Sequence, residues 1–162
     1  MSSRSILIIH GPNLNLLGRR EPEIYGTQTL EMINQEIIRK GHALGLTVSC
    51  RQSNHEGEIT DWLQQAEGQG FSGIIINPAA YTHTSVAIRD AIAAIRVPVI
   101  EIHLSNIFNR EAFRRESLTA AVCHGSICGF GPISYQLAIE AFNIIFLTDA
   151  HDNPANPQAQ KP

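Results

Sequence analysis

The stretch Ile6-Leu7-Ile8-Ile9 is a short, uninterrupted run of branched apolar residues near the start of the chain. This pattern is typical of a strand that is buried on both faces of a parallel sheet. Gly11-Pro12-Asn13 breaks regular structure directly after the run, and the segment from there to Gly26 has no clear period. We therefore predict a first strand followed by a long loop, and long loops in compact domains usually carry function.

Beyond this loop, apolar patterns of helical and strand-like spacing alternate along the chain. Branched apolar runs predict further strands at 46–50, 73–77, 98–102 and 120–128. Helical spacing predicts helices at 28–44, around 59–66, at 85–95 and at 133–147. Because the connections are short, this alternation predicts a flavodoxin-like α/β fold, a doubly wound sandwich around a five-stranded parallel sheet of order 2-1-3-4-5.

The composition is that of a globular protein with a real core. Of the 162 residues, 43% are hydrophobic and 17% are charged, which excludes the composition of a disordered chain. We predict a single domain over 1–148 and a disordered C-terminal tail over 149–162, where three prolines lie among Asn, Gln and Ala.

Charge and the N-terminal sequence argue against several classes of partner. The formal net charge of -3 gives no overall attraction to nucleic acid or to an anionic membrane, so we expect neither as a partner. The apolar run 6–9 is too short for a signal peptide or a membrane span, which predicts a cytoplasmic protein. Cys50, Cys123 and Cys128 are odd in number and form no C-x-x-C pair, so we interpret them as small buried hydrophobes.

Polar residues follow three of the expected strands. They lie at 10–13, 77–83 and 101–106. Since the carboxyl ends of parallel strands meet at one edge of the sheet, these residues are expected to converge on a ligand site. The alternative is that they are polar only because loops after strands usually are.

Glu101 and His103 are two residues apart in an expected strand, so their side chains should point to the same face. The carboxylate would then orient the imidazole and support its cationic form, which suits a general acid. A hydrogen-bonded histidine at a strand end, without a catalytic role, is the alternative.

The loop after the first expected strand concentrates Arg19, Arg20 and Tyr25. Tyrosine, with a pKa of about 10, is a poor base at neutral pH, and the deficit of about three units corresponds to roughly 4 kcal/mol. A nearby guanidinium group acts in the required direction because it favours the phenolate. The alternative is that both arginines are solvated and that Tyr25 only packs.

A second group of arginines, Arg110, Arg114 and Arg115, lies in an expected short helix after Asn106. One of them is a candidate for holding a substrate carboxylate as a bidentate pair, and the alternative is a solvated helix face. Their spacing does not choose among them.

Five blocks of the sequence resemble the type II dehydroquinases in order and spacing. The leading block, Gly11-Pro-Asn-Leu-Asn-Leu-Leu-Gly-Arg-Arg-Glu-Pro-Glu-Ile-Tyr-Gly26, is similar to the family's first motif almost residue for residue. The other blocks are 52–62, 77–85, 100–106 and 110–115. The resemblance covers residues 5–147, with departures at Ala120, Cys123 and His124 that are expected to affect packing or an interface rather than the chemistry.

The resemblance implies a lyase that dehydrates 3-dehydroquinate through an enolate, without a cofactor or a metal. Tyr25 would remove a proton from C2 with its pKa lowered by Arg20, and His103 would protonate the departing C1 hydroxyl. Asn13 would help to hold the water that stabilises the enolate. The positions that would anchor the substrate are Asn77, His83, Leu104, Ser105 and Arg114, together with Asp90 of a neighbouring subunit.

The resemblance also implies a homododecamer built from trimers and a mobile lid over 19–25, flanked by Gly18 and Gly26 as hinges. The unrelated type I enzymes use a lysine Schiff base. Here Lys40 and Lys161 are the only lysines, one on an expected helix and one in the tail, which leaves no suitable lysine. The reaction would serve shikimate and aromatic amino acid biosynthesis or the catabolism of quinate.

Two other classes remain as alternatives. The glycine-rich run 125–131 before the last helix suggests a flavodoxin-like module that binds a nucleotide or flavin, although a phosphate loop should open the first helix instead. A metal hydrolase that uses the seven histidines is disfavoured because their spacing offers no H-x-x-x-H pair.

Overall fold

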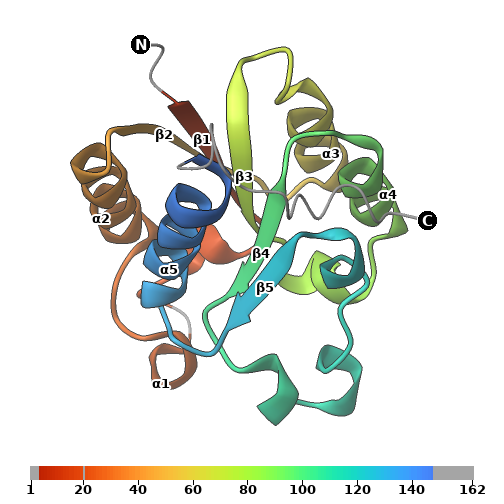
Figure 1. Ribbon diagram of the computed structural model, residues 1–162. Coiled ribbons are helices and arrows are strands. Elements are labelled where there is room, and N and C mark those ends of the chain that lie inside the picture. The colour runs from red at the N-terminus through yellow and green to blue at the C-terminus, as the bar shows by residue number, and fades with distance from the viewer. Residues whose placement is uncertain (1–3, 20, 148–162) are drawn as a thin grey trace.

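The computed structural model describes residues 4–19 and 21–147, apart from the side chains of Tyr25, Phe146 and Leu147. In this part of the chain, five parallel strands form one sheet of order β2-β1-β3-β4-β5 (Figure 1). The strands are β1 (Arg4–His10), β2 (Leu46–Gln52), β3 (Phe71–Asn77), β4 (Val99–His103) and β5 (Gly125–Cys128). The predicted flavodoxin-like strand order is confirmed, whereas the predicted tail lies outside the described residues.

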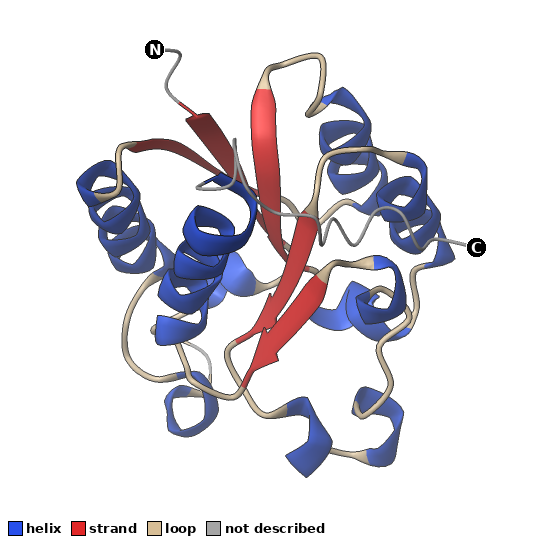
Figure 2. Ribbon diagram, in the orientation of Figure 1, coloured by secondary structure: helices blue, strands red, loops and turns tan. Residues whose placement is uncertain are grey.

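Helices cover both faces of this sheet (Figure 2). On one face lie α2 (Leu30–Ala43) and α5 (Ile133–Phe142), and on the other lie α3 (Glu56–Gln65) and α4 (Val86–Ala94). The single turn α1 (Pro22–Tyr25) lies beyond the carboxyl ends of the strands (Figure 1). The arrangement is the doubly wound sandwich that the alternating pattern predicts.

Successive residues of β1 point into two different cores. Ile6 and Ile8 pack with residues of α2 and α5, whereas Leu7 and Ile9 pack with residues of α3 and α4. All four side chains are completely buried, and full burial of one such side chain stabilises the fold by about 1.5–3 kcal/mol. Burial on both faces explains why the run that opens the chain contains no polar residue.

The predicted fifth strand is shorter than its apolar pattern indicated. Residues Ala120–Val122 form a 3-10 turn, and Gly125–Cys128 alone pair with β4. The Ser117 hydroxyl accepts a hydrogen bond from the backbone N–H of Ala120 (2.9 Å). Side chain to backbone bonds of this kind compete with strand pairing, so the segment before β5 turns instead of extending.

Three other segments differ from the predicted elements. The long loop after β1 contains the 3-10 turn Leu14–Leu16 as well as α1. The expected short helix after Asn106 is a pair of 3-10 turns, Ile107–Asn109 and Ala112–Arg114. The last helix is α-helical to Phe142 and continues as the π-helical turn Asn143–Leu147.

The three cysteines, predicted to be small buried hydrophobes, are partly buried. Cys50 packs against the core under α2 and α5, and Cys123 packs against the core under α3 and α4. Burial, and then the nearby charge of Glu31, raise the pKa of Cys50 to about 12. The reactive thiolate is therefore disfavoured at this position.

Candidate active site

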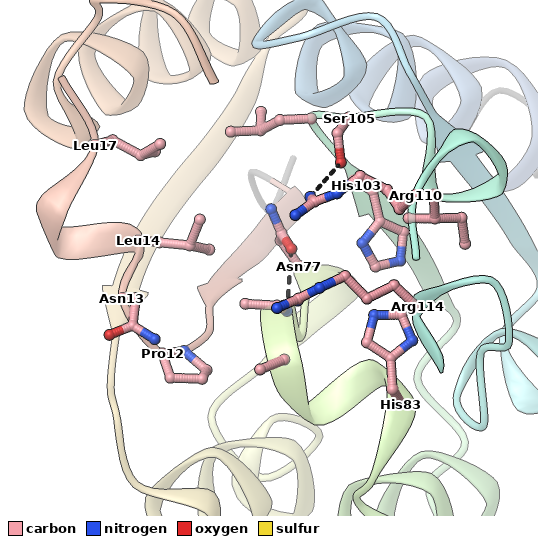
Figure 3. Close-up of a pocket in the computed structure, with 14 residues that line it drawn as sticks. Pro12, Asn13, Leu14, Leu17, Asn77, His83, His103, Ser105, Arg110 and Arg114 are labelled. Carbon is pink, nitrogen blue, oxygen red and sulfur yellow. Dashed lines mark hydrogen bonds between the residues drawn. The ribbon is translucent and has the colours of Figure 1, made fainter. Parts of the chain in front are cut away.

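A cavity of about 180 Å³ opens at the carboxyl ends of β1, β3 and β4 (Figure 3). Ligands bind at this edge in doubly wound sheets, where the strand order changes direction. Seven of the predicted site residues line the cavity: Asn13, Asn77, His83, His103, Leu104, Ser105 and Arg114.

His103 is the last residue of β4, and Glu101 lies beside it on the same face of the strand. The two side chains meet at 2.7 Å, between His103 Nε2 and Glu101 Oε1. The Glu101 side chain is completely buried and that of His103 is 7% exposed. Because Nε2 is bonded to the carboxylate, Nδ1 is the ring nitrogen that remains for a ligand in the cavity.

The Glu101 carboxylate receives two further hydrogen bonds, from the hydroxyls of Ser117 (2.9 Å, to Oε1) and Thr119 (to Oε2). Burial alone would raise the pKa of Glu101. The hydrogen bonds and charge of His103, followed by the bonds from Thr119 and Ser117, outweigh burial and lower that pKa. Glu101 is therefore an anion behind the histidine, which stabilises the imidazolium form.

Asn77 is the buried last residue of β3, and its side chain faces the cavity (Figure 3). Its Oδ1 accepts a hydrogen bond from the backbone N–H of Ala79 (3.1 Å), which fixes the orientation of the amide. Its Nδ2 lies 3.5 Å from the Tyr135 hydroxyl, behind the cavity. The amide is thus held from two sides.

His10, at the end of β1, belongs to a buried polar network and does not line the cavity. Its Nδ1 lies 2.6 Å from the Tyr135 hydroxyl, and its Nε2 lies 2.8 Å from Asn34 Oδ1. Burial lowers the pKa of His10 to about 4, against a smaller opposing effect of the bond to Asn34. The neutral ring therefore donates from Nε2 and accepts the tyrosine proton at Nδ1. Nothing in the sequence links His10 to residue 135, so this network was not predicted.

Asn13 lines the cavity where the backbones of the loops after β1 and β3 lie close together. The Gly11 N–H donates to the Asn77 carbonyl (2.8 Å), and a Cβ atom on Gly11 would lie 2.5 Å from the Pro78 carbonyl oxygen. Glycine is therefore required there. Asn13 has φ 67°, in the left-handed region that asparagine tolerates, and its N–H donates to Asn54 Oδ1 (2.9 Å).

His83 ends the 3-10 helix Ala79–His83, which follows β3. Its Nδ1 lies 2.6 Å from the backbone carbonyl oxygen of Glu116, so Nδ1 carries the proton that it donates. The neutral ring then has an acceptor lone pair on Nε2 for a hydroxyl group of a ligand.

Two of the described arginines, Arg110 and Arg114, line the cavity, whereas the resemblance singled out Arg114 for substrate binding. Arg114 Nε lies 3.2 Å from Glu111 Oε2, and Arg110 Nη1 lies 3.4 Å from Ser105 Oγ. Arg115 is not part of the lining, and its Nε donates to the Arg110 carbonyl (2.9 Å). Arg110 is thus a site residue that the sequence offered as a candidate but did not select.

Of the predicted site residues whose side chains the structure describes, Glu101 and Asp90 do not line the cavity. Glu101 lies behind His103, where it is placed to orient the imidazole as predicted. Asp90 is on α4, with a side chain that is 66% exposed and an ion pair to Arg89 (3.4 Å). Its predicted site is in a neighbouring subunit and stays a prediction. Arg20 and the side chain of Tyr25 lie outside the described residues.

Among the described residues, no three or more His, Cys, Asp or Glu side chains are grouped so that they could hold a metal ion. In that same part of the chain, no helix has the length and apolar character needed to cross a membrane.

Fold and site together define a class: a flavodoxin-like α/β protein whose ligand cleft, at the switch in strand order, contains a histidine supported by a buried carboxylate. The family model described as Dehydroquinase class II matches residues 4–143. The chain belongs to this family, and it is a lyase. The resemblance in the sequence motifs is confirmed.

Individual relatives agree with this assignment. A 3-dehydroquinate dehydratase of Ruegeria pomeroyi is 57% identical over 137 residues, which cover 85% of this chain and 91% of that protein. The type II dehydroquinase of Butyrivibrio crossotus has a crystal structure with a TM-score of 0.87 at 47% identity, covering 88% of this chain and 99% of that one. The crystal structure of the type II dehydroquinase of Propionibacterium acnes has a TM-score of 0.84 at 42% identity, covering 87% of this chain and 97% of that one. These matches do not favour the nucleotide- or flavin-binding alternative.

Proposed function

We propose that this chain dehydrates 3-dehydroquinate to 3-dehydroshikimate in the described cavity, with Tyr25 as proton acceptor and His103 as proton donor. The observation that carries the proposal is the buried Glu101–His103 pair in the cavity wall, in a chain whose relatives are named 3-dehydroquinate dehydratases. Loss of a hydroxide group needs an acid, and this pair provides one.

The first step removes a proton from C2, beside the ketone. Tyr25 would take this proton as a phenolate, and the electron pair of the C–H bond would move into an enolate with its charge on the ketone oxygen. A phenolate near neutral pH requires a lowered pKa, which the guanidinium group of Arg20 would provide. A water held with the help of Asn13 would stabilise the enolate oxygen.

In the second step the enolate collapses and the C1 hydroxyl departs. The electron pair returns to form the C1–C2 double bond and the ketone, while the bond from C1 to oxygen breaks. His103 would donate the proton on Nδ1, so that water leaves rather than hydroxide. Glu101 keeps its hydrogen bond to Nε2 throughout, which orients the ring and stabilises its charged form.

The other lining residues would hold the substrate in place. We assign the substrate carboxylate to the paired guanidinium groups of Arg110 and Arg114, because planar N–H forks match carboxylates. Asn77 and His83 offer a donor and an acceptor for ring hydroxyls. The backbone and hydroxyl of Leu104-Ser105 complete this set.

We further propose that the enzyme is a cytoplasmic homododecamer made of trimers, which serves aromatic amino acid biosynthesis or quinate catabolism. Asp90 would enter a neighbouring site. The exposure of its side chain and the position of its ion-pair partner, the preceding residue Arg89, leave the carboxylate near the surface of α4.

The decisive experiment follows ultraviolet absorbance of the conjugated enone product after purified chain, with a chelator present, is mixed with 3-dehydroquinate. The wild type should produce a steady rise, and His103→Asn should lower the rate by roughly 100- to 10,000-fold. His55→Asn changes an exposed histidine that does not line the cavity and should retain the wild-type rate. Folded wild-type protein that gives no rise would refute the assigned reaction.

A further inference from the structure

The segment between the arginines and β5 contributes two hydroxyl groups to the buried side of the acid. Ser117 donates to Glu101 Oε1 (2.9 Å), and Thr119 donates to Oε2. Thr119 is completely buried, and Leu118 between them fixes the segment by donating its N–H to the Thr82 carbonyl (2.9 Å). Neither hydroxyl lines the cavity, so neither belongs to the proposed catalytic or substrate-binding residues.

The direction of these bonds follows from counting protons. Each hydroxyl has one proton, and Ser117 Oγ already accepts the N–H of Ala120 (2.9 Å). The two oxygens are 3.3 Å apart, but if each proton goes to Glu101, neither is left for the other hydroxyl. With the Nε2–H of His103, the carboxylate then receives three donors. A protonated Glu101 would place its own proton against one of them.

Within residues 4–19 and 21–147, few other groups near Glu101 could control its charge. Its neighbours in the sheet are Ile76 of β3 and Ser126 of β5, and neither titrates. On the loops, Tyr81 donates to the Asn54 carbonyl (2.7 Å). His83 is turned to the Glu116 carbonyl, and His124 Nδ1 accepts from the Val99 N–H (3.4 Å). His103 is the titratable group that bonds to Glu101.

We propose that Ser117 and Thr119 are positioning residues that hold Glu101 ionised, with Oε1 aimed at His103 Nε2, so that His103 is available as imidazolium. The inference rests on the proposed function, because it assigns these hydroxyls to the acid of that reaction. Loss of either donor leaves a lone pair of a buried carboxylate unsatisfied, which raises the pKa of Glu101. Once Glu101 is protonated, the charge that supports the imidazolium is gone.

The chain offers a matched pair of substitutions that tests this role. Thr119→Val removes a hydroxyl that bonds to Glu101. Thr82→Val removes a hydroxyl that is equally buried and has no hydrogen-bond partner among the described residues. We expect Thr119→Val to move the acidic limb of the pH dependence of kcat upward by about one unit and to lower kcat near that limb about tenfold. Thr82→Val should match the wild type, and Thr119→Ser, which keeps the hydroxyl, should restore the profile.

A second readout separates positioning from a purely structural effect. The Glu101 carboxyl group can be titrated by carbon-13 NMR in the wild type and in Thr119→Val, and its pKa should be higher in the variant because one of its hydrogen-bond donors is lost. If Thr119→Val does not fold, Ser117→Ala gives the same test at a half-buried residue. Unchanged pH profiles and an unchanged Glu101 titration in a folded variant would overturn the inference. A wild type that does not act on 3-dehydroquinate would refute the proposed function instead, and the titration would still test the positioning role.

Discussion

The two sides of the cleft are built in different ways. On the acid side, Glu101 and His103 lie on a central strand, and both carboxylate oxygens of Glu101 are hydrogen-bonded. The segment expected to carry the base contains only the single turn α1, whose residues 22–24 are exposed, between Gly18 (φ 83°) and Gly26 (φ 81°). Folding therefore fixes the proposed acid, whereas the proposed base belongs to an element whose described side chains are largely exposed.

The largest effect should come from removing the proposed base. Tyr25→Phe should lower kcat by at least about a thousandfold while leaving the melting temperature unchanged, because the exposed turn contributes little to folding. Steady-state kinetics and thermal unfolding measure both quantities. Tyr81→Phe is the control, since its hydroxyl bonds to the Asn54 carbonyl and does not line the cavity. Turnover near the wild-type level in Tyr25→Phe would remove Tyr25 from the base role.

The buried His10, at the end of β1 and just before the loop expected to carry the base, should make the stability of the protein depend on pH. The pKa of His10 is about 4 in the folded protein and about 6.5 when unfolded. Above pH 6.5 both states are neutral, so His10 contributes no pH dependence. As the pH is lowered from 6.5 to about 4, the unfolded state alone gains a proton. The free energy of unfolding should therefore decrease by up to about 3 kcal/mol over this range.

Urea unfolding at several pH values measures this loss. His10→Asn should remove the part of the slope that lies above pH 5, although its stability at pH 7 will also change. His42→Asn, at an exposed position on α2, should keep the wild-type slope. An identical slope in His10→Asn and the wild type would show that the buried network does not exclude the proton.

Substitution of Arg110 and of Arg115 should affect substrate binding differently. Arg110 lines the cavity and Arg115 does not. Arg110→Ala should raise KM about tenfold with a smaller change in kcat, because a carboxylate contact is made equally in the ground state and the transition state. Arg115→Ala removes a side chain of the same type from the same segment and should leave KM within about twofold. Equal effects of the two substitutions would argue against a direct contact of Arg110.

The sequence predicts the parts of this protein that follow a period or a topological rule. The apolar runs of β1 and β3 indicate strands buried on two faces, and the strand order places Asn77 and His103 at one edge. It also brings Glu101 beside His103, because alternate residues of a strand share a face.

Other site features depend on irregular loops, where no period operates. Ser117 and Thr119 bond to a carboxylate 16 and 18 residues earlier in the chain. They lie just before the predicted strand 120–128, which begins instead as a 3-10 turn. The contact between His10 and Tyr135 spans 125 residues. His10 ends β1 and Tyr135 lies in α5, so the tertiary fold brings these two side chains together and local sequence contains no signal for the contact.

The smallest predicted effect tests whether the expected lid depends on Gly26 as a hinge. Gly26 and Gly45 both have positive φ (81° and 73°), and a Cβ atom on either would meet nothing within 4 Å. Alanine at each should therefore cost about 1–2 kcal/mol through backbone strain alone. Gly45 follows α2, away from the cavity, so Gly45→Ala should lower stability without changing kcat/KM. Gly26→Ala should also lower kcat/KM, by up to about tenfold, since strain at the end of α1 displaces the turn that carries Tyr25. If both variants keep the wild-type kcat/KM, the position of α1 does not limit the reaction, and the contrast between a fixed acid and a movable base fails at its weaker side.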